Sequence, residues 1–180
     1  DRPTFSMALD RAQRLPWARQ VLDGIIAAGD AALAMEVVVP DEPGQWSMHY
    51  VCKQCGAGLR QEGARHVCAH CGAEYTGWPY DQVVAGHLHF ANWERIRTLG
   101  LAYAFTGRED YARRARDLLL AYSAKYLTYP RHDKRNLNTP WGARVFAQTL
   151  DEAVGIIGVA WGYDLVYNSP CFSAEDREQI

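Results

Sequence analysis

The sequence predicts a mainly α-helical protein that carries a small β-rich insert with four cysteines. In several long segments, apolar residues recur at steps of three and four, as on the buried face of a helix. Residues 36–80 lose this period and contain a cluster of cysteines. We therefore expect three parts: N-terminal helices in 1–35, the insert with an aromatic loop in 36–80, and helical hairpins in 81–180.

The composition is that of an ordinary globular domain. The 180 residues are 48% hydrophobic and 22% charged, and the formal net charge is −2. Near-neutral charge disfavours a nucleic-acid partner, which usually needs a basic face. No apolar run approaches the roughly 20 residues of a membrane span. The opening Asp1-Arg2-Pro3 lacks the apolar segment of a signal peptide. We expect no nucleic-acid partner, no membrane span and no signal peptide.

The N-terminal part is predicted to be helical. A short mixed segment, 6–14, precedes Pro16, which suits a first helical turn because its missing N–H is not needed there. Residues 17–35 then show helical spacing. The pattern changes at Glu36, where 37–39 and 45–51 favour strands on either side of a loop.

Helical spacing returns after Tyr80. Residues 83–106 and 108–126 are predicted as two helices separated at Gly107, and a polar loop follows as far as Pro140. A long helix is predicted from about residue 142 to 167. Ser173, followed by two acids, predicts the N-cap of a further helix, which the end of the sequence interrupts.

The four clustered cysteines form two matching motifs. Cys52-x-x-Cys55 and Cys68-x-x-Cys71 are separated by 12 residues, and each is followed by Gly-Ala. A Cys-x-x-Cys turn aims two thiolates at one point, and two such turns complete a tetrahedral sulfur shell that suits zinc. Four thiolates leave no open position, so we expect structural zinc. Two disulfides and a redox dithiol are the alternatives.

Other cysteine and histidine residues are given structural interpretations. His66 and His70 flank the second motif and are interpreted as surface residues. Cys171 is interpreted as a small buried apolar residue. His87 and His89 are two residues apart on a predicted helix and face different sides, so a shared metal is not expected. We expect one of the two histidines to face a cleft.

Two polar or aromatic groups are candidates for binding a ligand. The loop 75–81 can offer aromatic faces to sugar rings or can wedge the insert onto the helices. Arg144, Gln148, Asp151 and Glu152 form a stripe that is either solvated or lines a groove, where arginine can hold a carboxylate or sulfate. The candidate substrate-binding residues are Trp78, Tyr80, His87, Asn138, Trp141, Arg144, Gln148 and Glu152.

Three stretches resemble the heparinase II/III-like polysaccharide lyases of bacteria. They are His66-Val67-Cys68-x-x-Cys71-Gly72-x-x-Tyr75-x-Gly77-x-Pro79-Tyr80-Asp81, the hairpin 99–115, and Gln148-x-Leu150-Asp151-Glu152-Ala153. The resemblance covers most of the chain from Cys52 onward. It implies a partial (α/α) toroid, followed in full-length members by a β-sandwich. It also implies β-elimination on uronate polysaccharides such as heparin, heparan sulfate or alginate.

The resemblance leaves the catalytic residues unassigned. The family's catalytic Asn or His, Tyr and His lie later in the chain, and no motif here matches them. The resemblance implies that this chain is the N-terminal part of a lyase. Either this part is inactive on its own, or the whole protein is a family member that has lost its catalytic activity. Its partners would be an acidic polysaccharide and the remaining toroid and β-sandwich of the same polypeptide. A periplasmic or secreted location is favoured over a cytoplasmic one.

Two other functions fit the residues. One is a helical-repeat interaction module with a structural zinc ribbon, although no period of about 34 residues recurs. The other is a fragment of an (α/α)-barrel glycoside hydrolase that uses Asp151 or Glu152, with a second carboxylate supplied from elsewhere.

Overall fold

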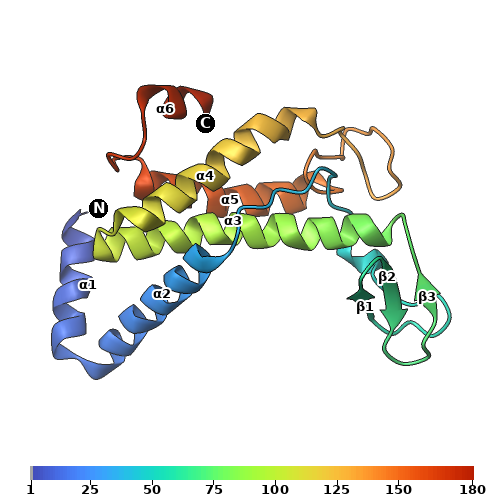
Figure 1. Ribbon diagram of the computed structural model, residues 1–180, viewed down its shortest axis with the longest axis horizontal. Helices are drawn as coiled ribbons and strands as arrows, with labels where there is room; N and C mark the ends of the chain where they lie inside the picture. The colour runs from blue at the N-terminus through green and yellow to red at the C-terminus, as the bar shows by residue number, and fades with distance from the viewer. Residues whose placement is uncertain (1) are drawn as a thin grey trace. The chain divides into compact units, whose positions relative to one another are not determined.

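A computed structural model describes residues 2–180, with side chains from Thr4 onward. The chain is mainly helical and holds a small three-stranded sheet, which confirms a mainly α protein with a β-rich insert (Figure 1). The strands are β1 (Leu59–Glu62), β2 (Arg65–Cys68) and β3 (Glu74–Tyr75). The helices are α1 (Arg2–Arg14), α2 (Pro16–Ala34), α3 (Tyr80–Thr106), α4 (Glu109–Lys125), α5 (Thr149–Val166) and α6 (Ala174–Gln179).

The chain divides into two compact units. The first contains the segment that ends at Val38, together with Asn92–Ser123 and Gly155–Ile180. The second contains Val39–Ala91 and Ala124–Val154, and therefore holds the sheet and the four clustered cysteines. Helices α3 and α5 each contribute residues to both units. The sequence-based division at residues 35 and 80 is a different partition and stays a prediction.

The residues predicted to begin, end or cap helices do so in the structure. Pro16 begins α2, and Gly107 follows α3 with a positive φ of 67°. Ser173 caps α6: its hydroxyl accepts the Asp176 N–H at 3.1 Å, and the Asp176 carboxylate accepts the Ser173 N–H at 2.9 Å. The two helices predicted after Tyr80 are confirmed as α3 and α4.

The core of the first unit includes a close crossing of α3 and α5. A Cβ on Gly162 would lie 2.6 Å from the Ile96 carbonyl oxygen, and one on Gly100 would lie 2.8 Å from the Gly162 carbonyl oxygen. Glycine at both positions therefore lets the two backbones touch. The surrounding buried residues are Ala32, Ile96, Leu99, Ala102, Tyr111, Ala112, Ala115, Leu118, Leu119, Val166 and Phe172.

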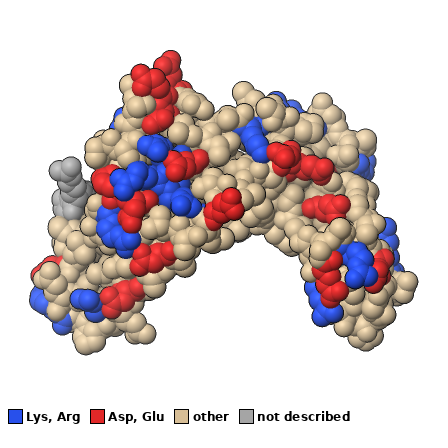
Figure 2. All heavy atoms as spheres, in the orientation of Figure 1, with Lys and Arg blue, Asp and Glu red and all other residues tan. Residues whose placement is uncertain are grey.

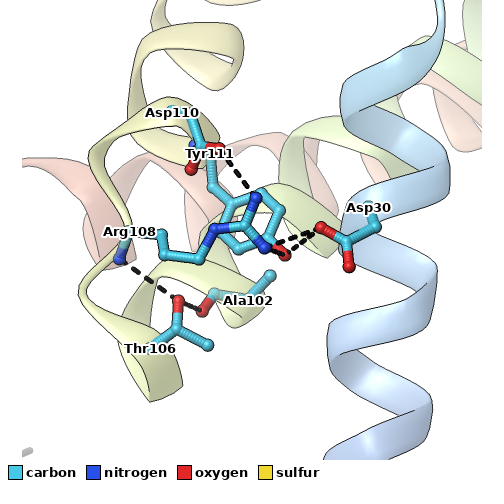
Figure 3. A network of polar contacts seen from close by, with 6 residues as sticks. All are labelled: Asp30, Ala102, Thr106, Arg108, Asp110 and Tyr111. Atoms are coloured by element: carbon cyan, nitrogen blue, oxygen red, sulfur yellow. Dashed lines mark hydrogen bonds and ion pairs between the residues drawn. The ribbon is translucent and has the colours of Figure 1, made fainter.

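A polar network joins α2 to the α3–α4 hairpin in this unit (Figure 3). The Tyr111 hydroxyl donates to the Asp30 carboxylate at 2.6 Å, and the Arg108 guanidinium donates to the same oxygen at 2.7 Å. Arg108 also pairs with Asp110 at 2.7 Å and stacks over the Tyr111 ring, 4.3 Å from its centroid. The hydrogen bond from Tyr111, and next the one from Arg108, lower the pKa of Asp30 below its ordinary value of 3.8.

This network predicts an acid-dependent loss of stability. A carboxylate whose pKa is lower in the folded state stabilises above its unfolded pKa, and the contribution is lost as pH falls through the folded value. We expect Asp30→Asn to reduce the decline in melting temperature of the wild type below pH 3.8. Asp23→Asn, an exposed change on the same helix, is the control and should keep the wild-type decline. Equal profiles for wild type and Asp30→Asn would refute the assignment.

The sheet of the second unit is antiparallel with strand order β1-β2-β3. Leu59 pairs with Cys68 and Glu62 with Arg65, so the β1–β2 turn falls at Gly63, whose φ is 62°. His66 pairs with Tyr75 in the β2–β3 register. The sheet thus links the segments that carry the two cysteine motifs.

Two predicted strands are wrong. Residues 37–39 are irregular, because side chains from α3 donate hydrogen bonds to backbone carbonyls in this segment. Asn92 donates to the Val38 oxygen at 2.8 Å, and Arg95 donates to the neighbouring Glu36 oxygen at 3.0 Å. Residues 45–51 contain a 3-10 turn at Ser47–His49 in place of a strand. The valine run and the loose alternation did not reveal that strand pairing in these segments is limited to one antiparallel bridge between Val51 and Gly58.

The predicted helix from about residue 142 starts later, at Thr149. The Glu152 carboxylate accepts the backbone N–H groups of Arg144, Val145 and Phe146 at 3.0, 2.6 and 3.1 Å. These three residues are therefore held as a turn around a buried carboxylate. Arg144 and Gln148 precede α5, so the predicted stripe on one helix is also wrong.

Charges of both signs are interspersed on the face drawn in Figure 2. Within residues 2–180, no helix combines the length and hydrophobicity needed to span a membrane.

Candidate functional site

The four cysteines of the second unit gather at one point. Their sulfur atoms all lie within 4.8 Å of one another. The separations are 3.6 Å for Cys52–Cys71, 3.5 Å for Cys55–Cys68 and 3.6 Å for Cys55–Cys71. A zinc–sulfur bond of about 2.3 Å places the sulfurs of a tetrahedral site about 3.8 Å apart. The spacing therefore fits one metal ion, and it exceeds the roughly 2.05 Å of a disulfide.

The two motifs fold in the same way. Cys52 and Cys68 donate their N–H groups to the carbonyls five residues later, at 2.7 and 2.9 Å, and each sulfur accepts the N–H two residues later at 3.4 Å. Gly56 and Gly72 both have a φ of 73°. This positive φ explains why glycine follows each pair. The repeat in sequence is thus a repeat in backbone geometry, and the four-sulfur cluster follows from it.

Tyr75 connects the cluster to the aromatic loop. Its hydroxyl lies 3.2 Å from the Cys52 sulfur and accepts the Lys53 N–H at 3.0 Å, so the hydroxyl proton is directed at the sulfur. This hydrogen bond lowers the pKa of Cys52 to about 6. A thiolate is the form that binds a metal, so the contact favours coordination.

The prediction that His66 is a surface residue is wrong, because its side chain is 0% exposed. Asp81 can only accept at this contact, so the His66 Nε2–H donates to it at 2.7 Å. The other ring nitrogen then accepts from the Tyr50 hydroxyl, also at 2.7 Å. The histidine ties the sheet to the start of α3 and is not free to bind the metal. His70 is exposed, as predicted.

The aromatic loop has one buried side and one exposed side. Tyr80 is 3% exposed, and its ring lies 5.0 Å from that of Tyr75 and 5.7 Å from His66, so it packs as a wedge. Trp78 is 49% exposed and lies 6.3 Å from the His49 ring. One face of the loop therefore stabilises the lobe, and Trp78 remains available for a ligand.

His87 lines a hollow in the second unit, with a cavity volume of about 570 Å³. Gly44 packs against the lining residue Gly86: a Cβ on Gly44 would lie 2.5 Å from the Gly86 Cα. Gln45 is held there by its N–H, which donates to the Gln82 carbonyl at 2.9 Å. The walls are mostly apolar, and the polar side chains include a carboxylate as well as the imidazole. The lining residues are Gln45, Ser47, Gly86, His87, Phe90, Ala91, Phe146, Leu150, Asp151 and Val154.

Another hollow of this unit, which we call the arginine hollow, is lined by Arg131 and Arg144. Its volume is about 270 Å³, and the other lining residues are Tyr126, Gly142, Ala143, Thr149 and Glu152. Glu152 is 8% exposed. Its carboxylate accepts hydrogen bonds from backbone N–H groups and from the Tyr126 hydroxyl, which donates at 2.7 Å. Burial, followed by this bond, raises the pKa of Tyr126 to about 12, so the phenol stays protonated at neutral pH.

The structure places the remaining predicted residues in different surroundings. Trp141 is 78% exposed, and Asn138 lies exposed in the preceding loop. Gln148 is half-buried just before α5. The structure brings Arg144 and Glu152 to one hollow and His87 to another. Sequence reasoning did not select Arg131 or Tyr126, although Arg131 stands out in the polar loop before Trp141.

No known family model matches the chain. Over about half its length, the chain is similar to two proteins named as alginate lyases. An exo-oligoalginate lyase of Saccharophagus degradans is 37% identical over 92 residues, and an alginate lyase of Stenotrophomonas maltophilia is 35% identical over the same length. The match covers 51% of this chain and only 12% of each relative.

Proposed function

We propose that this chain is the N-terminal portion of a bacterial polysaccharide lyase that cleaves a uronate-containing polymer by β-elimination. The observation that carries the proposal is the 35–37% identity over 92 residues to two enzymes named as alginate lyases. Alginate-like substrates are favoured over heparin-like ones for this reason. The small share of each relative that is matched supports a role as one part of a larger enzyme, with the catalytic residues outside this chain.

The helical hairpins are proposed to form part of an (α/α) toroid of the heparinase II/III-like type. The pairing of α3 with α4 through Gly107 is compatible with such a hairpin array. A periplasmic or secreted location is proposed, because the polymers concerned are extracellular.

The cysteine cluster is proposed to hold a structural zinc ion. Four sulfurs at tetrahedral spacing leave no position for substrate, which supports an architectural role. When bound, zinc would crosslink the two motifs. Tyr75 and the glycines after each motif would hold the thiolates in place.

The substrate is proposed to contact the predicted residues whose side chains remain accessible: Trp78, His87, Asn138, Trp141, Arg144 and Gln148. Trp78 and Trp141 can stack on sugar rings, whose C–H faces pack against aromatic rings. Tyr80 and Glu152 are enclosed, and their contacts support structural roles. A lyase must stabilise the enolate formed when the C5 proton leaves, which demands hydrogen-bond donors at the uronate carboxylate.

The test is to incubate the full-length polypeptide that contains this sequence with alginate and, separately, with heparan sulfate. The expected result is an increase in ultraviolet absorbance from the unsaturated product with alginate. No unsaturated product from any uronate polymer would refute the lyase proposal. New reducing ends without unsaturation would favour the glycoside hydrolase, since hydrolysis leaves no double bond.

A further inference from the structure

We propose that the arginine hollow binds the carboxylate of one uronate residue through Arg131 and Arg144 together. The inference deepens the proposed function, on which it rests, by naming the group that this hollow recognises. It also adds Arg131, which the sequence did not select.

Both guanidinium groups are fixed in place by the main chain. Arg131 donates to the carbonyls of Pro140 and Gly142 at 2.8 and 3.1 Å. Arg144 donates to the carbonyls of Leu127 and Tyr129 at 3.3 and 2.7 Å. Each arginine therefore reaches across to the segment that carries the other. These crossed contacts hold the two side chains in position before a ligand arrives.

The backbone between the arginines is equally constrained. His132 and Ala143 exchange N–H···O hydrogen bonds of 2.9 and 3.0 Å. A Cβ on Gly142 would lie 2.5 Å from the His132 carbonyl oxygen, so only glycine permits this close approach. The hollow thus has rigid walls, which reduces the entropy lost when a ligand binds.

The side chains that line the hollow carry one more positive charge than negative charge. Arg131 and Arg144 pair with carbonyl oxygens, which carry no formal charge. Among the lining residues, Glu152 supplies the acid, and its carboxylate is already occupied by three backbone N–H groups and the Tyr126 hydroxyl. Two positive groups against one negative group favour an incoming anion.

The free donors suit a carboxylate. A guanidinium has five N–H groups, and each arginine uses two hydrogen bonds on the main chain, so donors remain on both. Carboxylates accept such donors in pairs. Arg131 is exposed and Arg144 is half-buried, so a ligand can reach the first and be partly desolvated at the second. A polymer with a carboxylate on every ring offers this group repeatedly.

The experiment is an isothermal calorimetric titration of the full-length polypeptide that contains this sequence with an alginate trisaccharide. We expect Arg131→Gln and Arg144→Gln each to weaken binding about tenfold or more, because each removes hydrogen bonds to a charged group. Arg131→Lys keeps the positive charge but loses the paired N–H donors of the guanidinium, and should bind with intermediate affinity. Arg60→Gln removes an exposed arginine paired with Glu62 on β1 and should bind as the wild type does.

Arg131→Gln and Arg144→Gln each also remove two main-chain contacts, so circular dichroism must show that both variants are folded. A neutral trisaccharide such as maltotriose should bind at least tenfold more weakly than the uronate. The inference is overturned if the wild type does not bind the uronate trisaccharide, if both glutamine variants bind like the wild type, or if maltotriose binds equally well. Such a failure together with lyase activity in the full-length protein rejects only the arginine hollow. Arginine-dependent binding without lyase activity rejects only the proposed reaction.

Discussion

Replacing Cys68 by serine is expected to abolish metal binding and to unfold the β-rich lobe around the cysteines. The Cys68 sulfur accepts the N–H groups of His70 and Cys71 at 3.4 Å and lies 3.5 Å from the Cys55 sulfur. Structural zinc sites of small domains are worth about 10–16 kcal/mol of apparent binding free energy at neutral pH. The rest of this lobe is a sheet of only three short strands, so the metal is expected to supply most of its stability.

The measurement is elemental analysis combined with amide hydrogen exchange. The wild type should carry about one zinc per chain, and a chelator should deprotect the amides of residues 51–76. Without any chelator, Cys68→Ser should show the exchange pattern that the wild type shows after treatment with the chelator. Cys171→Ser is the matched control, because Cys171 lies outside the cluster and contacts Ser169 instead. A metal-free wild type, or full zinc content in Cys68→Ser, would contradict the prediction.

Substituting alanine for Gly162 is expected to destabilise the first unit by about 1–3 kcal/mol, the usual cost of overpacking a core. The new Cβ would lie 2.6 Å from the Ile96 carbonyl oxygen and 2.7 Å from its carbon. These are backbone atoms inside α3, so they cannot move aside as a flexible side chain can. Helices α3 and α5 would have to separate, and the contacts of the buried cluster around Ile96 and Val166 would weaken.

Gly24→Ala is the matched control for this prediction. Gly24 is also within a helix, but a Cβ there meets nothing within 4 Å. Alanine costs less conformational entropy than glycine in a helix, so this variant should be unchanged or more stable by about 0.5–1 kcal/mol. The measurement is the midpoint of urea denaturation of each variant, compared with that of the wild type. Equal midpoints for Gly162→Ala and the wild type would show that α3 and α5 do not require this contact.

The four-cysteine cluster could be predicted from the sequence because the geometry of each motif is local. Each motif closes on itself through hydrogen bonds that span two to five residues, and the glycine after it supplies the positive φ. Helix boundaries at Pro16, Gly107 and Ser173 were predictable for the same reason, since each depends on atoms within one turn.

His87, Arg144 and Glu152 were predicted as candidate binding residues, but their grouping into separate hollows could not be predicted because their partners are distant in sequence. Spacing alone assigned Arg144, Gln148 and Glu152 to one helix. The buried Glu152 carboxylate instead gathers the three N–H groups of residues 144–146 and delays α5 until Thr149. Arg131 was not selected because its importance depends on Gly142 and Arg144, which the chain brings to it only in the folded state.

The sequence by itself therefore determined the mainly helical class, the β-rich insert and the four-cysteine cluster, because short-range sterics and hydrogen bonds suffice for these features. Only the tertiary structure decided which polar groups are consumed by the fold and which remain for a ligand. Burial converts His66 and Glu152 into structural groups, since a polar atom removed from water must find its partner inside the protein. Arg131 and Arg144 reach main-chain carbonyls and keep donors to spare, which is the basis for assigning them to a carboxylate.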